Sequence, residues 1–309
     1  MGPYDAKLLA PQPYVRVAGT ESNVIQLQIA VREFVPLRGR GSSIWLVGVS
    51  HVGESNYYAA LQRKLDAQTL VLFEGISGHG LPGEPDETPS PAGTSLSERN
   101  SRSSLQTSLA ASLGLVFQLE AIDYERLNFR NCDLSIQQLR QILVGQRTAQ
   151  GEPGSAANFE GLLQLMGGGS WLDSLLQAAL RFLGTNPKLQ ALGRLMLIDI
   201  LDQIQGDPSQ WHDLPSNLKQ LLEVLLQGRN EHVIAELKAE LPRLGRHSSV
   251  AVFYGVGHMP DLEQRLRQQL NYAPAKQFWL TAFSVDLKHS GVTEAERQLV
   301  DRLVKSQLQ

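Results

Sequence analysis

Two apolar runs near opposite ends of the chain close on the same short motif: Ile44-Trp45-Leu46-Val47-Gly48-Val49-Ser50-His51 and Val250-Ala251-Val252-Phe253-Tyr254-Gly255-Val256-Gly257-His258. A short, continuous apolar run is typical of a strand buried on both faces. Each histidine falls where such a strand would end. Open α/β sheets bind ligands at the carboxyl ends of their strands, so the two GxxH motifs predict that His51 and His258 share a crevice.

The sequence around each motif extends the same pattern. Residues 24–34 and 44–49 predict a hairpin, residues 54–66 a helix, and residues 69–73 a short strand that ends at Glu74. After the second motif, a helix over 260–270 and a closing strand over 277–283 are expected. The sequence therefore favours an α/β fold. Its mostly parallel central sheet would be built from two strand–GxxH–helix–strand units.

The middle of the chain has a different texture. Residues 77–104 are rich in Gly, Pro, Ser and Glu, which predicts a mobile loop, either a lid or a tolerated insertion. Residues 105–113 predict a helix and residues 115–122 a third strand. Residues 135–241 are helical in pattern, with separate helices expected over 213–226 and 230–241. We expect one domain over 1–309, with 135–241 as a helical insertion.

Composition excludes several classes of function. The chain has 309 residues, with 28 basic against 31 acidic side chains, and no basic stretch long enough to follow a phosphate backbone, so no nucleic-acid partner is expected. Cys132 is the single cysteine, which excludes an intramolecular disulfide and a cysteine-rich zinc site. No signal peptide and no membrane span is predicted, which favours a cytoplasmic protein.

His51, His258 and Glu74 form the main candidate site. Two neutral imidazoles and one carboxylate, with a position left for water, are what a catalytic divalent metal requires. Mn, Co and Zn all suit this donor set, and affinity order alone does not choose among them. The alternative for each histidine alone is a capping or core role. The remaining histidines have loop or surface contexts and are not assigned a role: His79, His212, His232, His247 and His289.

Other polar residues near the predicted third strand are secondary candidates. Asp133 or Asp123 could ligate a metal, act as a general base, or orient an imidazole, and Asp133 could equally cap the helix that follows. Arg229 could lie over an anionic group of a substrate, or simply be solvated beside a helix start at Asn230. Cys132 lacks any local signature of a nucleophile.

Together, Gly48-Val49-Ser50-His51, Phe73-Glu74-Gly75, Gly228-Arg229-Asn230 and Tyr254-Gly255-Val256-Gly257-His258 resemble the TraB/Tiki family. This family is also called TraB/PrgY/GumN and is related to erythromycin esterases and ChaN haem-uptake proteins. The resemblance implies an α/β fold with a helical insertion and, in the Tiki branch, a metal-dependent protease. It implies that His51, Glu74 and His258 are the metal and catalytic positions, with Arg229 in support. The assignment of Asp133 as a catalytic residue comes from its surrounding sequence alone and not from the resemblance.

Three functions are compatible with the sequence. The first is a metal-dependent hydrolase, peptidase-like, in which a metal-bound water attacks an amide or ester carbonyl of a peptide or small molecule. The second is a noncatalytic protein that binds a peptide, a small ligand or haem in the same crevice. The third is a helical interaction scaffold whose histidines are structural.

Overall fold

A mixed β-sheet with helices on both faces organises the chain, and the predicted α/β class is confirmed. The computed structural model describes residues 13–19, 21–38, 41–75, 107–134, 138, 184–204 and 216–308. The predicted loop at 77–104 and the predicted helices at 139–183 lie outside these residues.

The sheet has a parallel part and an antiparallel part. Its strands are β1 (Val15–Ala18), β2 (Val24–Pro36), β3 (Ser43–Val49), β5 (Leu70–Phe73), β7 (Phe129–Asn131), β8 (Ser249–Gly255) and β9 (Tyr272–Asp286). They lie in the order β1-β2-β3-β8-β5-β7, with β9 paired to β2. The β3–β8, β8–β5 and β5–β7 pairs are parallel, whereas β2 is antiparallel to β1, β3 and β9. Four neighbouring strands therefore end at the same edge of the sheet.

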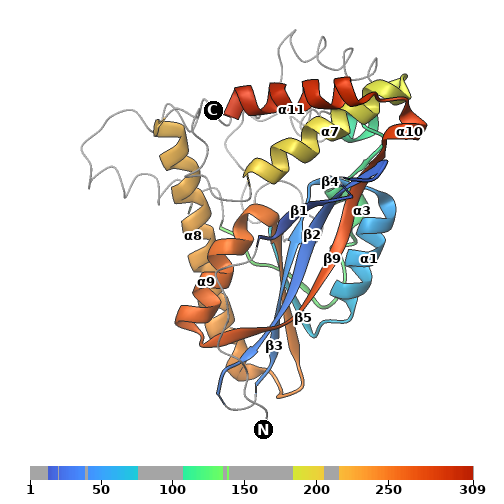
Figure 1. The fold of residues 1–309 in the computed structure, drawn as a ribbon. Helices are drawn as coiled ribbons and strands as arrows, with labels where there is room; N and C mark the ends of the chain where they lie inside the picture. The colour runs from blue at the N-terminus through green and yellow to red at the C-terminus, as the bar shows by residue number, and fades with distance from the viewer. Residues whose placement is uncertain are drawn as a thin grey trace, which may run out of the picture.

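Helices cover both faces and one end of this sheet. They are α1 (Ser55–Asp66), α3 (Gln118–Ala121), α7 (Pro187–Ile204), α8 (Ser216–Glu240), η2 (Leu241–Arg243), η3 (Val256–His258), α9 (Met259–Gln269), α10 (Leu287–Ser290) and α11 (Glu294–Leu308). In Figure 1, α8 and α9 lie on one side of the strands, α1 and α3 on the other, and α7 and α11 across the top. Among the described residues, no helix is long and apolar enough to cross a lipid bilayer.

The parallel strands are continuous apolar runs because both of their faces are buried. Side chains of a strand alternate between faces, and β8 shows the consequence. Ala251 and Phe253 pack in the core that contains Leu61 of α1. Val252 and Tyr254, one residue on, belong to a second core with side chains of α8 and α9. The strand that carries the second GxxH motif is thus fixed from both sides.

A buried ion pair ties α9 to the sheet. Arg32 of β2 contacts Glu263 of α9 at 2.7 Å, with both side chains nearly inaccessible to solvent. The Tyr14 hydroxyl donates a second hydrogen bond to the same carboxylate at 2.6 Å. A buried pair with several hydrogen bonds fixes one arrangement of its elements, since breaking it leaves an uncompensated charge. The helix that follows His258 is anchored in this way.

The expected strands and helices around the first motif are present, as β2, β3, α1 and β5, and β8 lies between β3 and β5. After the second motif, α9 and β9 are also present. However, β9 runs antiparallel along β2, with its register from Val24↔Asp286 to Pro36↔Tyr272. The closing strand therefore does not lie parallel beside β8 as β5 does.

The strand predicted over 115–122 is wrong in extent. Only β6 (Val116–Phe117) is extended, and it pairs with β4 (Val52–Gly53) outside the main sheet. The chain then turns into α3 because the Gln118 N–H donates to the carbonyl of His51 at 2.9 Å. The apolar residues of 115–122 can be buried by a short helix as well as by a strand. The strand that completes the parallel sheet is β7, and the helix expected over 105–113 is present at 107–112.

The break predicted at Gly228-Arg229-Asn230 is also wrong, because α8 is one helix over Ser216–Glu240. One glycine weakens a helix by only about 1 kcal/mol and does not by itself end it. Arg229 and Asn230 therefore project from the interior of α8. Neither lies at a helix start, and both side chains are engaged by residues of the sheet edge.

Candidate functional site

Five of the predicted site residues gather at the carboxyl edge of the parallel strands. His51 follows β3, Glu74 follows β5, Asp133 follows β7, and His258 lies in η3 directly after β8. Arg229 reaches this edge from α8 and contacts both Glu74 and Asp133. Because β3, β8, β5 and β7 are neighbours, their ends deliver four side chains to one place.

Glu74 lies at the centre of the group. Its Oε1 accepts from Arg229 Nη2 at 2.6 Å, its Oε2 accepts from the Gly255 N–H at 2.6 Å, and His258 Nε2 lies 3.8 Å from Oε1. Burial alone would raise the pKa of this carboxyl. The charges of Arg229 and the two histidines, with the Gly255 hydrogen bond, lower the pKa to about 2 instead. Glu74 is therefore ionised at neutral pH.

Arg229 bridges two carboxylates. Its Nε donates to Asp133 Oδ1 at 2.8 Å and its Nη2 to Asp133 Oδ2 at 2.6 Å, a two-point pairing that suits the planar guanidinium. The Asp133 side chain has no exposed surface. Burial would lower the pKa of Arg229, but Glu74 and Asp133 raise it well above its ordinary value. Asp133 thus contacts Arg229, which in turn contacts Glu74. Asp133 Oδ1 also accepts a hydrogen bond from the Leu134 N–H at 2.8 Å.

His258 is a buried imidazole with a defined tautomer. Its Nδ1 lies 2.7 Å from Asn230 Oδ1, and the Asn230 amide nitrogen donates to Asp261 Oδ2 at 2.8 Å. A carboxylate only accepts, so Asp261 fixes the orientation of the Asn230 amide, and Nδ1 of His258 must donate. Burial lowers the pKa of His258 although Glu74 opposes this. The neutral ring thus directs the lone pair of Nε2 toward Glu74.

His51 is exposed, but its Nδ1 is also held by an amide oxygen. Gln118 Oε1 lies 3.0 Å from His51 Nδ1, and no described residue hydrogen-bonds to Nε2. A β-carbon built on Gly255 would lie 3.3 Å from Glu74 Oε2 and 3.7 Å from His51 Nε2. The absent side chain of Gly255 therefore leaves a space that both groups face.

These donors match the chemistry of a divalent ion. Glu74 Oε2 and His51 Nε2 face the space above Gly255, and His258 Nε2 lies 3.8 Å from the other oxygen of the same carboxylate. Each Nδ1 contacts an amide oxygen, and metal-ligating histidines commonly have an acceptor at their second ring nitrogen. Ligands of one tetrahedral zinc lie roughly 3.4 Å apart, close to the 3.8 Å between Glu74 and His258. Among the described residues, however, no three His, Cys, Asp or Glu side chains form a ready-made metal cluster.

The remaining sequence candidates lie elsewhere. Asp123 is beside Arg126 on the surface, at 3.0 Å, and is not brought to the site. Cys132 is buried, which raises the pKa of its thiol to about 12 and keeps it from acting as a thiolate at neutral pH. His247 is exposed just before the amino end of β8, His289 is exposed on α10, and His232 lies on α8. His79 and His212 are outside the described residues.

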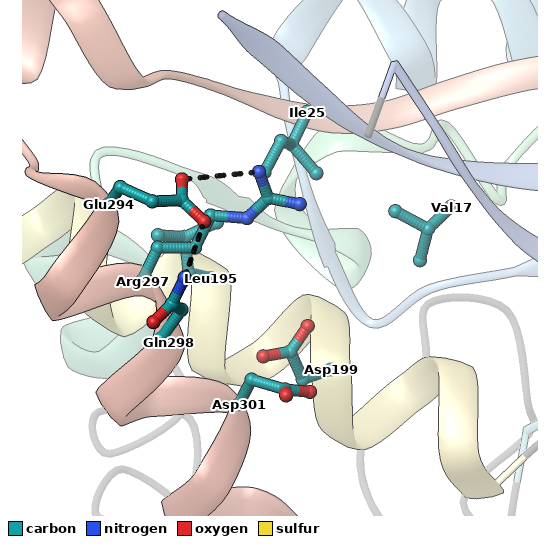
Figure 2. Close-up of a pocket in the computed structure, with 8 residues that line it drawn as sticks. All are labelled: Val17, Ile25, Leu195, Asp199, Glu294, Arg297, Gln298 and Asp301. Atoms are coloured by element: carbon teal, nitrogen blue, oxygen red, sulfur yellow. Dashed lines mark hydrogen bonds and ion pairs between the residues drawn. The ribbon is translucent and has the colours of Figure 1, made fainter. Parts of the chain in front are cut away.

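A cavity of about 260 Å³ lies between β1, β2, α7 and α11 rather than at this edge. Figure 2 shows Asp199 of α7 and Asp301 of α11 close together in its wall, with Glu294 joined to Arg297. None of the five gathered residues lines it. Burial, together with the charges of Asp301 and Asp202, raises the pKa of Asp199 to about 6. An acidic pair in a cavity wall does not by itself define a ligand.

Three further residues take part in the site: Gln118 contacts His51, the Tyr124 hydroxyl accepts from the Gln118 amide, and Asp261 accepts from Asn230. Their roles were missed from the sequence. Gln118 fell within the part of the predicted strand that is helical instead, so its side chain could not be placed next to His51. Asp261 is the third residue after His258, on the first turn of α9, where an acidic residue is common for helix-dipole reasons alone. Asn230 was quoted as part of a motif, but only the continuous α8 reveals its contact with His258.

The chain was compared with known proteins at three levels. No model of a protein family, no curated protein and no solved structure matches it.

Proposed function

We propose that the protein is a metal-dependent hydrolase, peptidase-like, of the TraB/Tiki type suggested by its motifs. The observation that supports this is the arrangement around Glu74. Two imidazoles there hold Nδ1 against amide oxygens, and both present Nε2 to the surroundings of one ionised carboxylate. A histidine that only fills a core or caps a helix does not need this orientation.

His51, His258 and Glu74 are the residues that would hold the ion, whether Mn, Co or Zn. When bound, such an ion lowers the pKa of a water ligand and polarises a carbonyl of the substrate. Arg229 keeps Glu74 ionised and fixes its Oε1, and Asp133 holds Arg229 in place. Arg229 and Asp133 are thus supporting residues in this proposal. The Gly255 N–H orients the other oxygen, Oε2.

The exposure of His51 beside the buried His258 gives the proposed site one open side. A peptide or small molecule would approach from the His51 side, because His258 is enclosed by Tyr254 and α8. We further propose that the chain has two strand–GxxH–helix–strand units, a helical insertion over 135–241, a single domain over 1–309, and a cytoplasmic location.

The test is hydrolysis of a pooled peptide library by the full chain, supplied in turn with Mn²⁺, Co²⁺ or Zn²⁺. We expect cleavage that a chelator abolishes and that fails in His258→Ala. His289→Ala, which removes an exposed histidine on α10, is the matched control and should retain full activity. Cleavage that survives both the chelator and His258→Ala would contradict the proposal.

A second candidate function uses the same edge, where His51 is exposed beside the buried His258. A noncatalytic protein that binds a peptide, a small ligand or haem at the same edge would be compatible with this. It predicts retention of a ligand by the folded chain and no turnover with any of the three metals.

A further inference from the structure

Gln118 contacts His51 twice, from a segment remote from both GxxH motifs. Its main-chain N–H donates to the His51 carbonyl at 2.9 Å, and its side-chain Oε1 lies 3.0 Å from His51 Nδ1. Gln118 is itself buried, whereas the imidazole it holds is exposed. An exposed ring on a strand-end turn is otherwise free to rotate, so these contacts decide where its Nε2 points.

Tyr124 completes this support. The Gln118 amide nitrogen donates to the Tyr124 hydroxyl at 2.8 Å, which leaves Oε1 to face His51. The Tyr124 ring packs against Phe73 with 5.0 Å between centroids, and against Phe253 at 6.2 Å. Phe73 directly precedes Glu74, so the same ring that fixes Gln118 also packs on the strand that delivers the carboxylate.

We propose that Gln118 and Tyr124 are positioning residues for His51, which hold its imidazole in the Nδ1–H tautomer so that the lone pair of Nε2 faces Glu74. This inference rests on the proposed function for its purpose, since a metal ligand needs an unprotonated Nε2. The contacts that orient His51 are present whether or not a metal binds. Asn230 and Asp261 fix the same tautomer of His258, so the two histidines are oriented by different side chains.

The tautomer can be read directly in the metal-free full chain labelled with ¹⁵N-histidine. We expect the His51 signals, assigned with His51→Ala, to show a protonated Nδ1 and an unprotonated Nε2 above the range where the ring is charged. In Tyr124→Phe the amide loses its fixed orientation, and the His51 signals should move toward a mixture of tautomers. Tyr272→Phe is the matched control, because its hydroxyl donates to the Ser42 carbonyl away from the site.

The second arm is affinity for Zn²⁺ by titration. Gln118→Met should weaken binding by about 10- to 100-fold, the usual effect of losing a partner of a ligating histidine, whereas Gln118→Glu should retain it because a carboxylate still accepts from Nδ1. Circular dichroism of each variant ensures that only folded protein is compared.

An Nε2–H tautomer of His51 in the wild type, or no change in Tyr124→Phe, would overturn the positioning role. Equal Zn²⁺ affinity in Gln118→Met and the wild type would overturn its purpose. Absence of Zn²⁺ binding by the wild type, with the Nδ1–H tautomer present and sensitive to Tyr124→Phe, would contradict the proposed function and leave the positioning role supported.

Discussion

Arg229 separates two carboxylates that would otherwise share a poorly hydrated site. Its Nη2 lies 2.6 Å from both Glu74 Oε1 and Asp133 Oδ2. Its side chain is 13% exposed, against 19% for Glu74 and none for Asp133. Removing one partner of such a group leaves charges that neither water nor another cation neutralises.

Arg229→Met should therefore lower the free energy of unfolding by about 3 kcal/mol, measured by denaturant unfolding at neutral pH. The control is Arg130→Met, which removes a partly exposed arginine paired with Glu236 and Glu240. Exposed pairs contribute little, so this control should cost less than about 1 kcal/mol. Equal losses in the two variants would show that the central ion pair is no more important than a surface one.

Gly255 is a residue whose missing side chain matters. Its backbone lies at φ −48° and ψ 140°, a conformation that alanine adopts without strain. The added β-carbon would enter the space that Glu74 Oε2 and His51 Nε2 face, at 3.3 and 3.7 Å. Steric occupation of this space can thus be separated from damage to the fold.

We expect Gly255→Ala to change stability by no more than about 1 kcal/mol and yet to lower Zn²⁺ affinity by more than about tenfold. Thermal unfolding and a metal titration give the two values. Gly245→Ala, in the turn that precedes β8, places its β-carbon at an ordinary 3.5 Å from Ser248 Oγ and should alter neither value. Unchanged affinity in folded Gly255→Ala would place the metal elsewhere.

At the scale of elements, two acidic side chains face each other where α7 and α11 meet, outside the candidate site. Asp199 of α7 faces Asp301 of α11 in the cavity of Figure 2, and Lys305 pairs with Asp301 at 2.9 Å. The folded chain binds a proton at Asp199 more tightly than the unfolded chain, because its pKa is about 6 instead of an ordinary 3.8. The stability that protonated Asp199 contributes is fully present below pH 3.8 and is lost as the pH rises through about 6.

Asp199→Asn should therefore raise the melting temperature at pH 7 and flatten its decline between pH 4 and pH 7. Solvent screening limits the gain to at most about 1 kcal/mol. Glu231→Gln, on the exposed part of α8, is the control and should leave the pH profile unchanged. A larger stability gain at pH 4 than at pH 7 would show that the sign of the pKa shift is wrong.

At the scale of the whole molecule, the elements that carry the motifs could be predicted from the sequence. β3, β5 and β8 are short apolar runs bounded by polar or glycine residues, and α1 and α9 have apolar residues at helical spacing. The parallel order of β3, β8 and β5 also explains why His51, Glu74 and His258 converge, because the carboxyl ends of these neighbouring strands lie at one edge of the sheet. The short apolar run at 115–122 fits both a strand and a buried helix, and the contact of Gln118 with His51 decides between them.

Contacts between segments far apart in sequence could not be predicted. Asn230 reaches His258 only because α8 continues through Gly228, and Arg229 joins Glu74 to Asp133 across the end of β7. Local propensity contains no information about these distances. The same holds for β9, because its sequence does not reveal whether it pairs in parallel with β8 or, as it does, antiparallel with β2.

The central claim is that His51, Glu74 and His258 hold one metal ion together. The most direct measurement is the metal content of the purified full chain by elemental analysis, with Zn²⁺, Mn²⁺ and Co²⁺ affinities by calorimetry, beside the His51→Ala/His258→Ala double variant. We predict near-stoichiometric metal in the wild type and none in a folded double variant. Wild-type protein that binds none of the three metals, or a double variant that binds as well as the wild type, would contradict the central claim.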